Sequence, residues 1–256
     1  MKGVNVIDAL LNDYTRILAD LNPAPFVPAT DKYSGVFLPV PFKEYWESHP
    51  KIMLVGRETA GWNTNNCKNT IQRIVRANEL GDLDTILAEA TGRYRKHLEF
   101  RADGSVVKKS ASRFKQYFFR LARELNIDPK GLIYANLFAW DYNKRSAKDR
   151  PEKELAEIIS VSNKLLAAQI KHLKPDFIIF ATGYDGIDPI IRRLFNDHFD
   201  GYENTAPVIP KKLWEFYGGG STCFRIAHPR AEHGHGVFRR EVIIRIKRHL
   251  YRNRDD

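Results

Sequence analysis

Apolar residues cluster into four short runs that have the length of buried β-strands. These runs cover residues 51–56, 132–138, 176–181 and 222–227. Continuous apolar runs of this length, bounded by glycine, proline or polar residues, are typical of strands covered on both faces. The sequence therefore predicts a four-stranded sheet that is mainly parallel.

Between these runs, apolar residues recur at helical spacing. The spacing predicts helices over residues 7–21, 112–125, 151–173 and 238–250, and a strongly charged helix over 82–100. Closely spaced prolines between residues 23 and 50 indicate extended backbone instead. Because the strands alternate with helices, we expect an α/β fold with three layers, αβα. It would form one domain over residues 1–256, with a helical insertion at about 63–131.

The composition is that of a globular protein with a large excess of positive charge. Of the 256 residues, 43% are hydrophobic, which is enough for a full core, and the formal net charge is +10. Such a charge favours a polyanionic partner such as nucleic acid. No apolar run reaches the roughly 20 residues of a membrane span, and the N-terminus lacks the pattern of a signal peptide. We expect a cytoplasmic monomer that binds DNA and no membrane.

The cysteines and histidines give little support to a metal site. Cys67 and Cys223 are too few for a disulfide framework. Cys223, His228, His233 and His235 are four potential ligands, but their spacing matches no ordinary zinc pattern. We therefore expect neither a metal nor another cofactor.

Polar residues follow three of the predicted strands and form a candidate site. The first strand ends at Gly56 and leads into Arg57 and Glu58, the second contains Asn136, and His228 follows the last. Ligands of open α/β sheets bind outside the carboxyl ends of the strands, so these side chains are expected at one edge. The alternatives are a surface salt bridge for Glu58, a core hydrogen bond for Asn136 and a structural role for His228.

The order of these features resembles the uracil-DNA glycosylase superfamily over residues 39–251, most specifically over 112–183. The resemblance rests on six segments, which are, in chain order, Gly56-Arg-Glu-Thr-Ala60, Phe114-Lys-Gln-Tyr-Phe-Phe-Arg-Leu-Ala-Arg-Glu-Leu-Asn-Ile127, Tyr134-Ala-Asn-Leu-Phe138, Arg150-Pro-Glu-Lys-Glu154, Lys174-Pro-Asp-Phe-Ile-Ile-Phe-Ala-Thr-Gly183 and His228-Pro229. The layout is similar to the iron–sulfur branch of the superfamily, but two cysteines cannot hold its cluster.

The resemblance implies a role for each residue of the candidate site. Glu58 would position or activate water, His228 would stabilise charge on the leaving base, and Asn136 would read the edge of a flipped-out base. Further substrate-binding residues would be Gly56, Arg57, Ala60, Gly61, Trp62 and Tyr184. DNA-binding residues would be Lys144, Arg145, Arg230, His233, His235 and Arg239.

Ala60 stands where the uracil-specific enzymes have a tyrosine that excludes 5-substituted bases. We therefore expect a DNA glycosylase that removes a pyrimidine with a bulky C5 substituent, such as the modified cytosines of some viruses, in antiviral defence. One alternative is uracil repair, with Trp62 or Tyr184 in place of the lost ring. The other is a nucleic-acid-binding module without catalysis, since Glu58-Thr59 stands where the family has aspartate and proline.

Overall fold

The computed structural model describes residues 2–62, 70–232 and 234–252, which fold into two compact units. Each unit is assembled from three separate segments of the chain. Unit 1 comprises the described residues of Met1–Val40, Glu58–His97 and Ala135–Leu173. Unit 2 comprises those of Pro41–Arg57, Leu98–Tyr134 and Lys174–Asp256.

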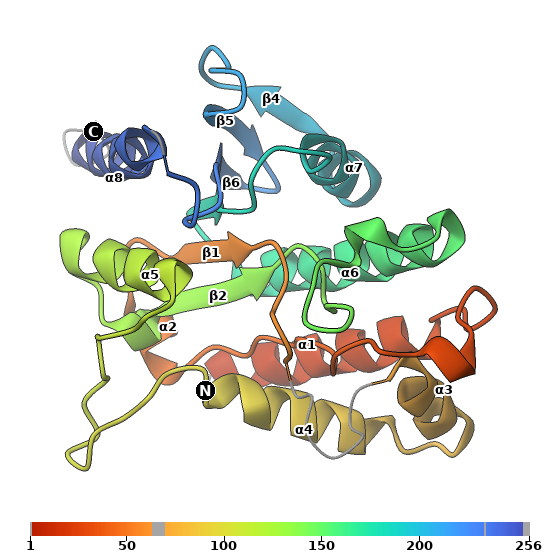
Figure 1. The fold of residues 1–256 in the computed structure, drawn as a ribbon. Helices are drawn as coiled ribbons and strands as arrows, with labels where there is room; N and C mark the ends of the chain where they lie inside the picture. The colour runs from red at the N-terminus through yellow and green to blue at the C-terminus, as the bar shows by residue number, and fades with distance from the viewer. Residues whose placement is uncertain (1, 63–69, 233, 253–256) are drawn as a thin grey trace. The chain divides into compact units, whose positions relative to one another are not determined.

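Unit 1 is built mainly from helices, whose apolar faces pack together. They are α1 (Lys2–Ala19), α3 (Ile71–Glu79), α4 (Leu83–Arg95) and α6 (Glu152–Leu173), with short 3-10 turns at Pro28–Thr30 and Ala147–Asp149. The long helix α1 lies against α6 and α4 (Figure 1). Leu10, Tyr14 and Leu18 are buried on α1, at the helical spacing that the sequence predicts. The hydroxyl of Tyr14 donates a hydrogen bond of 2.8 Å to the carbonyl of Pro39.

Unit 2 is organised around a mixed β-sheet. The strands are β1 (Ile52–Gly56), β2 (Leu132–Asn136), β3 (Phe177–Phe180), β4 (Tyr202–Asn204), β5 (Leu213–Gly218) and β6 (Ser221–Ile226), in the order β2-β1-β3-β6-β5-β4. The last two residues of β2, Ala135 and Asn136, are counted with unit 1. β1 pairs in parallel with β3, and β3 in parallel with β6. β6 and β5 are antiparallel, as are β5 and β4. The carboxyl ends of β1, β3 and β6 therefore share one edge.

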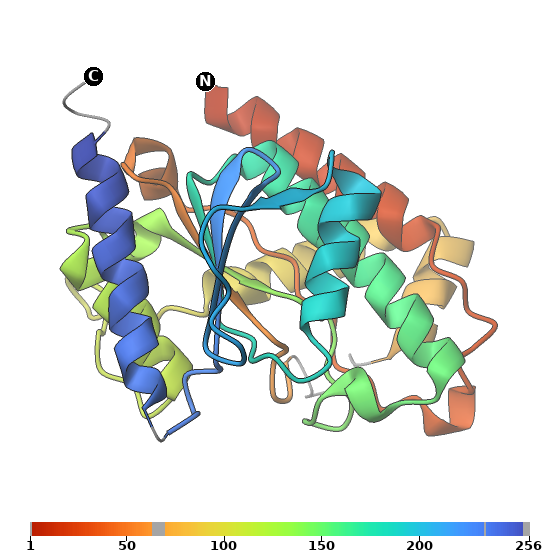
Figure 2. The ribbon, with the colours of Figure 1, turned by 90° about the horizontal axis from the view of Figure 1, so that it is seen from above.

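Helices cover both faces of this sheet within unit 2. The helices α5 (Arg113–Glu124) and α8 (His235–Arg252) share one hydrophobic core with β1, β3 and β6, in which Leu54, Leu121 and Ile246 are fully buried. Figure 2 shows α8 on one side of β5 and β6 and α7 (Asp188–His198) on the other. The ring of Phe195 on α7 meets that of Phe216 edge-on at 5.1 Å. Unit 2 also contains α2 (Lys43–Glu47) and a 3-10 turn at Pro129–Gly131.

The α/β class and the mainly parallel sheet are confirmed, but the prediction of four strands is wrong. The additional strands, β4 and β5, extend the sheet from β6 in the antiparallel direction. The glycines before β6 form a tight hairpin, in which Gly219 and Gly220 have φ values of 58° and 77°. A two-residue hairpin turn of type I′ requires positive φ at both of its central residues. These glycines therefore join two strands.

Several predicted boundaries also shift. The second strand ends at Asn136 and not at 138, and the charged helix predicted over 82–100 ends at Arg95. The described part of the predicted insertion contains α3, α4 and α5. The proline-rich stretch from 23 to 50 contains a short 3-10 turn and α2, and the rest of it has no regular secondary structure. The prediction of extended backbone therefore misses these two elements. No helix in the described ranges is long and apolar enough to cross a membrane.

Candidate functional site

The shared strand edge in unit 2 carries His228, two residues beyond β6. The loop after β3 passes beside it: a Cβ atom added to Gly183 would lie 4.0 Å from the backbone nitrogen of His228. Gly183 has a φ of +86°, which favours glycine at this position. The next residue of that loop, Tyr184, keeps 37% of its surface exposed. Within unit 2, the predicted residues His228 and Tyr184 therefore belong to adjoining loops.

His228 is a neutral hydrogen-bond donor in a positively charged environment. Burial lowers its pKa to about 4, and the charges of Arg57, Arg230 and Arg239 add to this effect. Its Nδ1 accepts a hydrogen bond of 3.2 Å from the backbone N–H of Arg230. A neutral imidazole whose Nδ1 is an acceptor carries its proton on Nε2. The Nε2–H group of His228 can therefore donate to a ligand at neutral pH.

The loop that carries His228 is fastened to α8 and α5. The backbone N–H of Ala231 donates to the carbonyl of His228 at 2.7 Å, which closes a turn. Arg239 on α8 donates from Nη1 to the carbonyl of Ala231 at 3.2 Å, and Tyr117 on α5 donates to the carbonyl of Arg239 at the same distance. These contacts fix two of the predicted DNA-binding residues, Arg230 within the turn and Arg239 on the helix that holds it.

Glu58 belongs to unit 1, where its carboxylate has a defined partner. The hydroxyl of Ser146 donates to Oε2 of Glu58 at 2.8 Å. The residues that follow Glu58 bind the buried carboxylate of Asp141, which accepts hydrogen bonds from Thr59, Gly61 and Trp62. The predicted residue Gly61 needs to be glycine, because its φ is +85° and an added Cβ would lie 3.0 Å from Cγ of Lys144.

Lys144 and Arg145 lie on an exposed turn close to this segment. Tyr142 and Arg145 exchange two backbone hydrogen bonds, of 2.9 and 3.0 Å, across Asn143 and Lys144. Both central residues have positive φ, 49° for Asn143 and 64° for Lys144. Left-handed lysine is uncommon, and such strain concentrates where side chains must be presented in a fixed direction. The turn places both predicted DNA-binding cations in solvent.

Asn136, the last residue of β2, has a buried amide without a protein partner. Its exposed fraction is 5%, and within the described part of the chain neither Oδ1 nor Nδ2 makes a hydrogen bond. Burying an amide without hydrogen bonds costs roughly 1–3 kcal/mol. Such an arrangement is expected where a ligand or an ordered water completes the bonding.

Trp62 and Ala60, two of the predicted substrate-binding residues, differ in how far they are packed against the protein. The ring of Trp62 packs edge-on against Phe37 at 4.8 Å and lies beneath the guanidinium of Arg93 at 5.2 Å. This indole is thus already used in the packing of unit 1. Ala60 is exposed, and its methyl group is all that this position offers to a ligand.

Among the described residues, no three His, Cys, Asp or Glu side chains form a group that could hold a metal ion. Cys223 is fully buried in β6, with Sγ against the carbonyls of Gly218 and Ser221. His235 is the first residue of α8. His233 and Cys67 lie outside the described residues.

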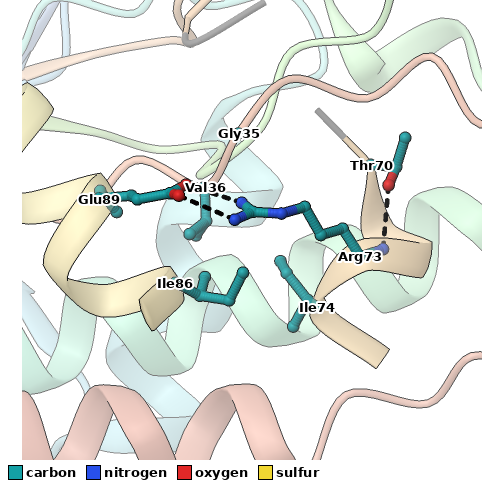
Figure 3. A pocket seen from close by; sticks show the side chains of 8 residues that line it. Gly35, Val36, Thr70, Arg73, Ile74, Ile86 and Glu89 are labelled. Carbon is teal, nitrogen blue, oxygen red and sulfur yellow. Dashed lines mark hydrogen bonds and ion pairs between the residues drawn. The ribbon is translucent and has the colours of Figure 1, made fainter. Parts of the chain in front are cut away.

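Unit 1 also contains a small pocket between α3 and α4 (Figure 3). Arg73 lines it and donates two hydrogen bonds to Glu89, of 2.8 and 2.9 Å, and its backbone N–H donates to Thr70. The volume is about 10 Å³, room for about one water molecule. This pocket is therefore too small to hold a nucleobase.

Sequence reasoning missed Ser146 and Thr59. Ser146 stands in a run of charged residues that has no strand or helix pattern, and 88 positions separate it from Glu58. Asp141 was at least recognisable as an acid just beyond the second strand.

No protein-family model matches the chain, and a search of curated proteins gives no match.

Proposed function

We propose that the protein is a DNA glycosylase with a fold like that of the uracil-DNA glycosylases, acting on a flipped-out pyrimidine without a metal or organic cofactor. The observation that carries the proposal is the state of His228, a neutral donor surrounded by Arg57, Arg230 and Arg239. A hydrolase that releases a base as an anion, next to DNA phosphates, needs this combination of donor and positive charge.

In the proposed reaction, the bond between C1′ of the sugar and N1 of the base breaks, and both electrons stay on the base. The Nε2–H of His228 donates to O2 of the base and so stabilises the negative charge that develops there. A neutral imidazole suits this step because its Nε2–H stabilises the charge by a hydrogen bond and keeps its proton, so that the base leaves as an anion.

Glu58 would serve the other half of the reaction. The sugar left behind resembles an oxocarbenium ion, which a carboxylate stabilises and to which water adds at C1′. Glu58 would orient that water and accept its proton. The unpartnered amide of Asn136 would bind the edge of the base; since an amide has both donor and acceptor groups, it can serve cytosine or uracil.

The proposed substrate is a pyrimidine with a bulky C5 group, such as a modified cytosine of viral DNA, and the proposed role is defence. Support comes from Ala60, which is exposed and carries only a methyl group. Trp62 is packed against Phe37 and Arg93, so its ring is not available to replace the missing tyrosine without leaving these contacts.

The test is a single-turnover base-release assay on DNA that carries uracil, mismatched thymine, or cytosine with small or bulky C5 groups. Glu58→Gln and His228→Ala should each lower the cleavage rate about 10²–10⁴-fold, while the affinity for DNA changes little, because both act on transition-state charge. Glu152→Gln and His49→Ala, which change the same residue types at exposed positions, are the controls. Equal cleavage by wild type and both site variants would remove the mechanism, and DNA binding without any base release would favour the non-catalytic module.

A further inference from the structure

Residues 141–146 form a clip that holds the segment 58–62, here named the Glu58 loop. We infer that Asp141 and Ser146 in this clip are positioning residues, which set the geometry of the Glu58 carboxylate before DNA binds; the inference rests on the proposed function. All the contacts that carry it lie within unit 1.

Asp141 gathers the Glu58 loop around one carboxylate. Its Oδ2 accepts hydrogen bonds from the hydroxyl of Thr59 at 2.6 Å and from the backbone N–H groups of Gly61 and Trp62 at 2.8 and 3.2 Å. Its Oδ1 accepts from the backbone N–H of Lys144 at 2.9 Å. Four donors converge on a side chain that is 0% exposed. An ionised carboxylate offers about four acceptor sites, so Asp141 is used to its capacity.

Asp141 is itself fixed from a third segment. Its backbone exchanges hydrogen bonds with Ser34: Ser34 N–H donates to the carbonyl of Asp141 at 2.8 Å, and Asp141 N–H donates to Oγ of Ser34 at 2.9 Å. The neighbouring Gly35 donates from its N–H to the carbonyl of Trp62 at 3.1 Å. Two adjacent residues therefore hold both parts, Ser34 the clip and Gly35 the end of the Glu58 loop.

Ser146 determines how the carboxylate of Glu58 is oriented. Its Oγ lies 3.4 Å from the backbone N–H of Lys148, from which it accepts, and 2.8 Å from Oε2 of Glu58, to which it donates. Because one contact uses the oxygen as acceptor, the hydroxyl hydrogen is directed at Glu58. The loop is thus fixed twice, along its backbone by Asp141 and at its acid by Ser146.

Such a clip matters because catalytic groups lose much of their effect when they are misplaced by about 1 Å, typically about 10²-fold in rate. Asp141→Asn would replace one carboxylate oxygen by an NH2 group, which cannot accept hydrogen bonds, so that part of the four contacts would be lost. Ser146→Ala would remove the bond to Glu58 together with the acceptor of the Lys148 N–H, and Ser146→Thr would keep the hydroxyl that makes both contacts. Asp149→Asn changes the same residue type at an exposed position three residues beyond the clip and is the matched control.

The experiment measures single-turnover base release, DNA affinity and amide hydrogen exchange of these variants. Ser146→Ala should lower the cleavage rate about 10-fold and Asp141→Asn about 100-fold, with DNA affinity within about twofold of wild type. Ser146→Thr should recover most of the rate, and Asp149→Asn should keep it. Exchange at Gly61 and Trp62 should accelerate in Asp141→Asn alone.

The outcomes separate this inference from the proposed function. Wild-type rates in both Asp141→Asn and Ser146→Ala, with the chain folded, would overturn the inference and leave the glycosylase proposal standing. If Asp141→Asn does not fold, Ser146→Ala and its rescue by Ser146→Thr decide the matter. If wild type releases no base, the proposed function fails and positioning for catalysis fails with it. Amide exchange then still shows whether Asp141 orders the loop.

Discussion

At the scale of single residues, His228 links the candidate site to the stability of the fold. Its pKa in the folded chain is about 4, against an ordinary value of 6.5, chiefly because the ring is buried. A proton therefore binds the unfolded chain more readily than the folded one between these two pH values. The stabilisation linked to neutral His228 is complete above about pH 6.5 and is lost as the pH falls toward 4.

This sign gives a measurable prediction for His228→Gln. Glutamine does not titrate, so the free energy of unfolding of wild type relative to the variant should decrease by about 1–2 kcal/mol from pH 7.5 to pH 4, after a discount for partial exposure. Urea unfolding at a series of pH values measures the difference, and the carboxylates that titrate in both proteins cancel. A difference that is constant with pH would mean that His228 titrates normally.

Ala60 gives the residue-scale test of substrate choice. A tyrosine at this exposed position would add a ring where the wild type has only a methyl group. Ala60→Tyr should abolish release of a bulky C5-modified base, at least 10²-fold, and spare or improve release of uracil, because steric exclusion acts on the large group alone. Competition between the two substrates in one assay measures the ratio. Efficient uracil release by wild type, without release of any 5-substituted base, would contradict the open-pocket argument.

The residues of the candidate site differ in how far sequence could identify them. Glu58, Asn136 and His228 follow or end apolar runs, so periodicity alone indicates a strand edge, and their catalytic roles stay predictions. The partnership of Ser146 with Glu58 has no local signal, because it depends on a contact between distant segments. Lys144 was expected from charge alone, whereas its left-handed backbone could not be, since no glycine or asparagine marks that position.

At the scale of elements, the strands with uniform apolar composition were predictable and the hairpin partner of β6 was not. β5 contains the buried Glu215, whose carboxylate accepts a hydrogen bond of 2.7 Å from Arg245 of α8. A charged residue inside a strand breaks the apolar pattern, and its pairing is visible only in the fold. β6 also contains a buried charge, Arg225, 2.7 Å from Asp188, but the apolar residues around it kept that strand recognisable.

Two glycines test how the elements are packed. Gly92 lies within α4, where an added Cβ would meet no atom of the other described segments within 4 Å. Gly218 ends β5, where a Cβ would lie 2.7 Å from Cδ1 of the buried Phe195. Gly92→Ala should therefore raise the free energy of unfolding by about 0.5–1 kcal/mol, through helix propensity. Gly218→Ala should lower it by about 1–3 kcal/mol, because a packed ring has to move. Urea unfolding of both variants measures the two changes in the free energy of unfolding. Equal changes would contradict the described packing.

At the scale of the whole molecule, alternation of strand and helix patterns was enough to predict the α/β class. It was not enough to predict that each compact unit is assembled from three separate segments. Local patterns report burial of single elements, whereas the grouping of elements depends on contacts between distant positions. Asp141 illustrates this, since its partners Thr59 and Ser34 lie 82 and 107 positions away.

The net charge of +10 leads to the last prediction, that DNA binding is mainly electrostatic. Each phosphate neutralised by lysine or arginine releases condensed counterions, so the logarithm of the affinity falls with the logarithm of salt concentration by about 0.9 per contact. Lys144→Ala with Arg145→Ala should reduce this slope by about 2 and weaken binding to every sequence alike. Arg16→Ala with Arg76→Ala removes the same charge from exposed positions of α1 and α3 and should leave the slope unchanged. Fluorescence anisotropy from 50 to 200 mM salt measures it. A flat salt response of wild type, or equal slopes in the two double variants, would show that the turn carrying Lys144 does not contact the phosphates.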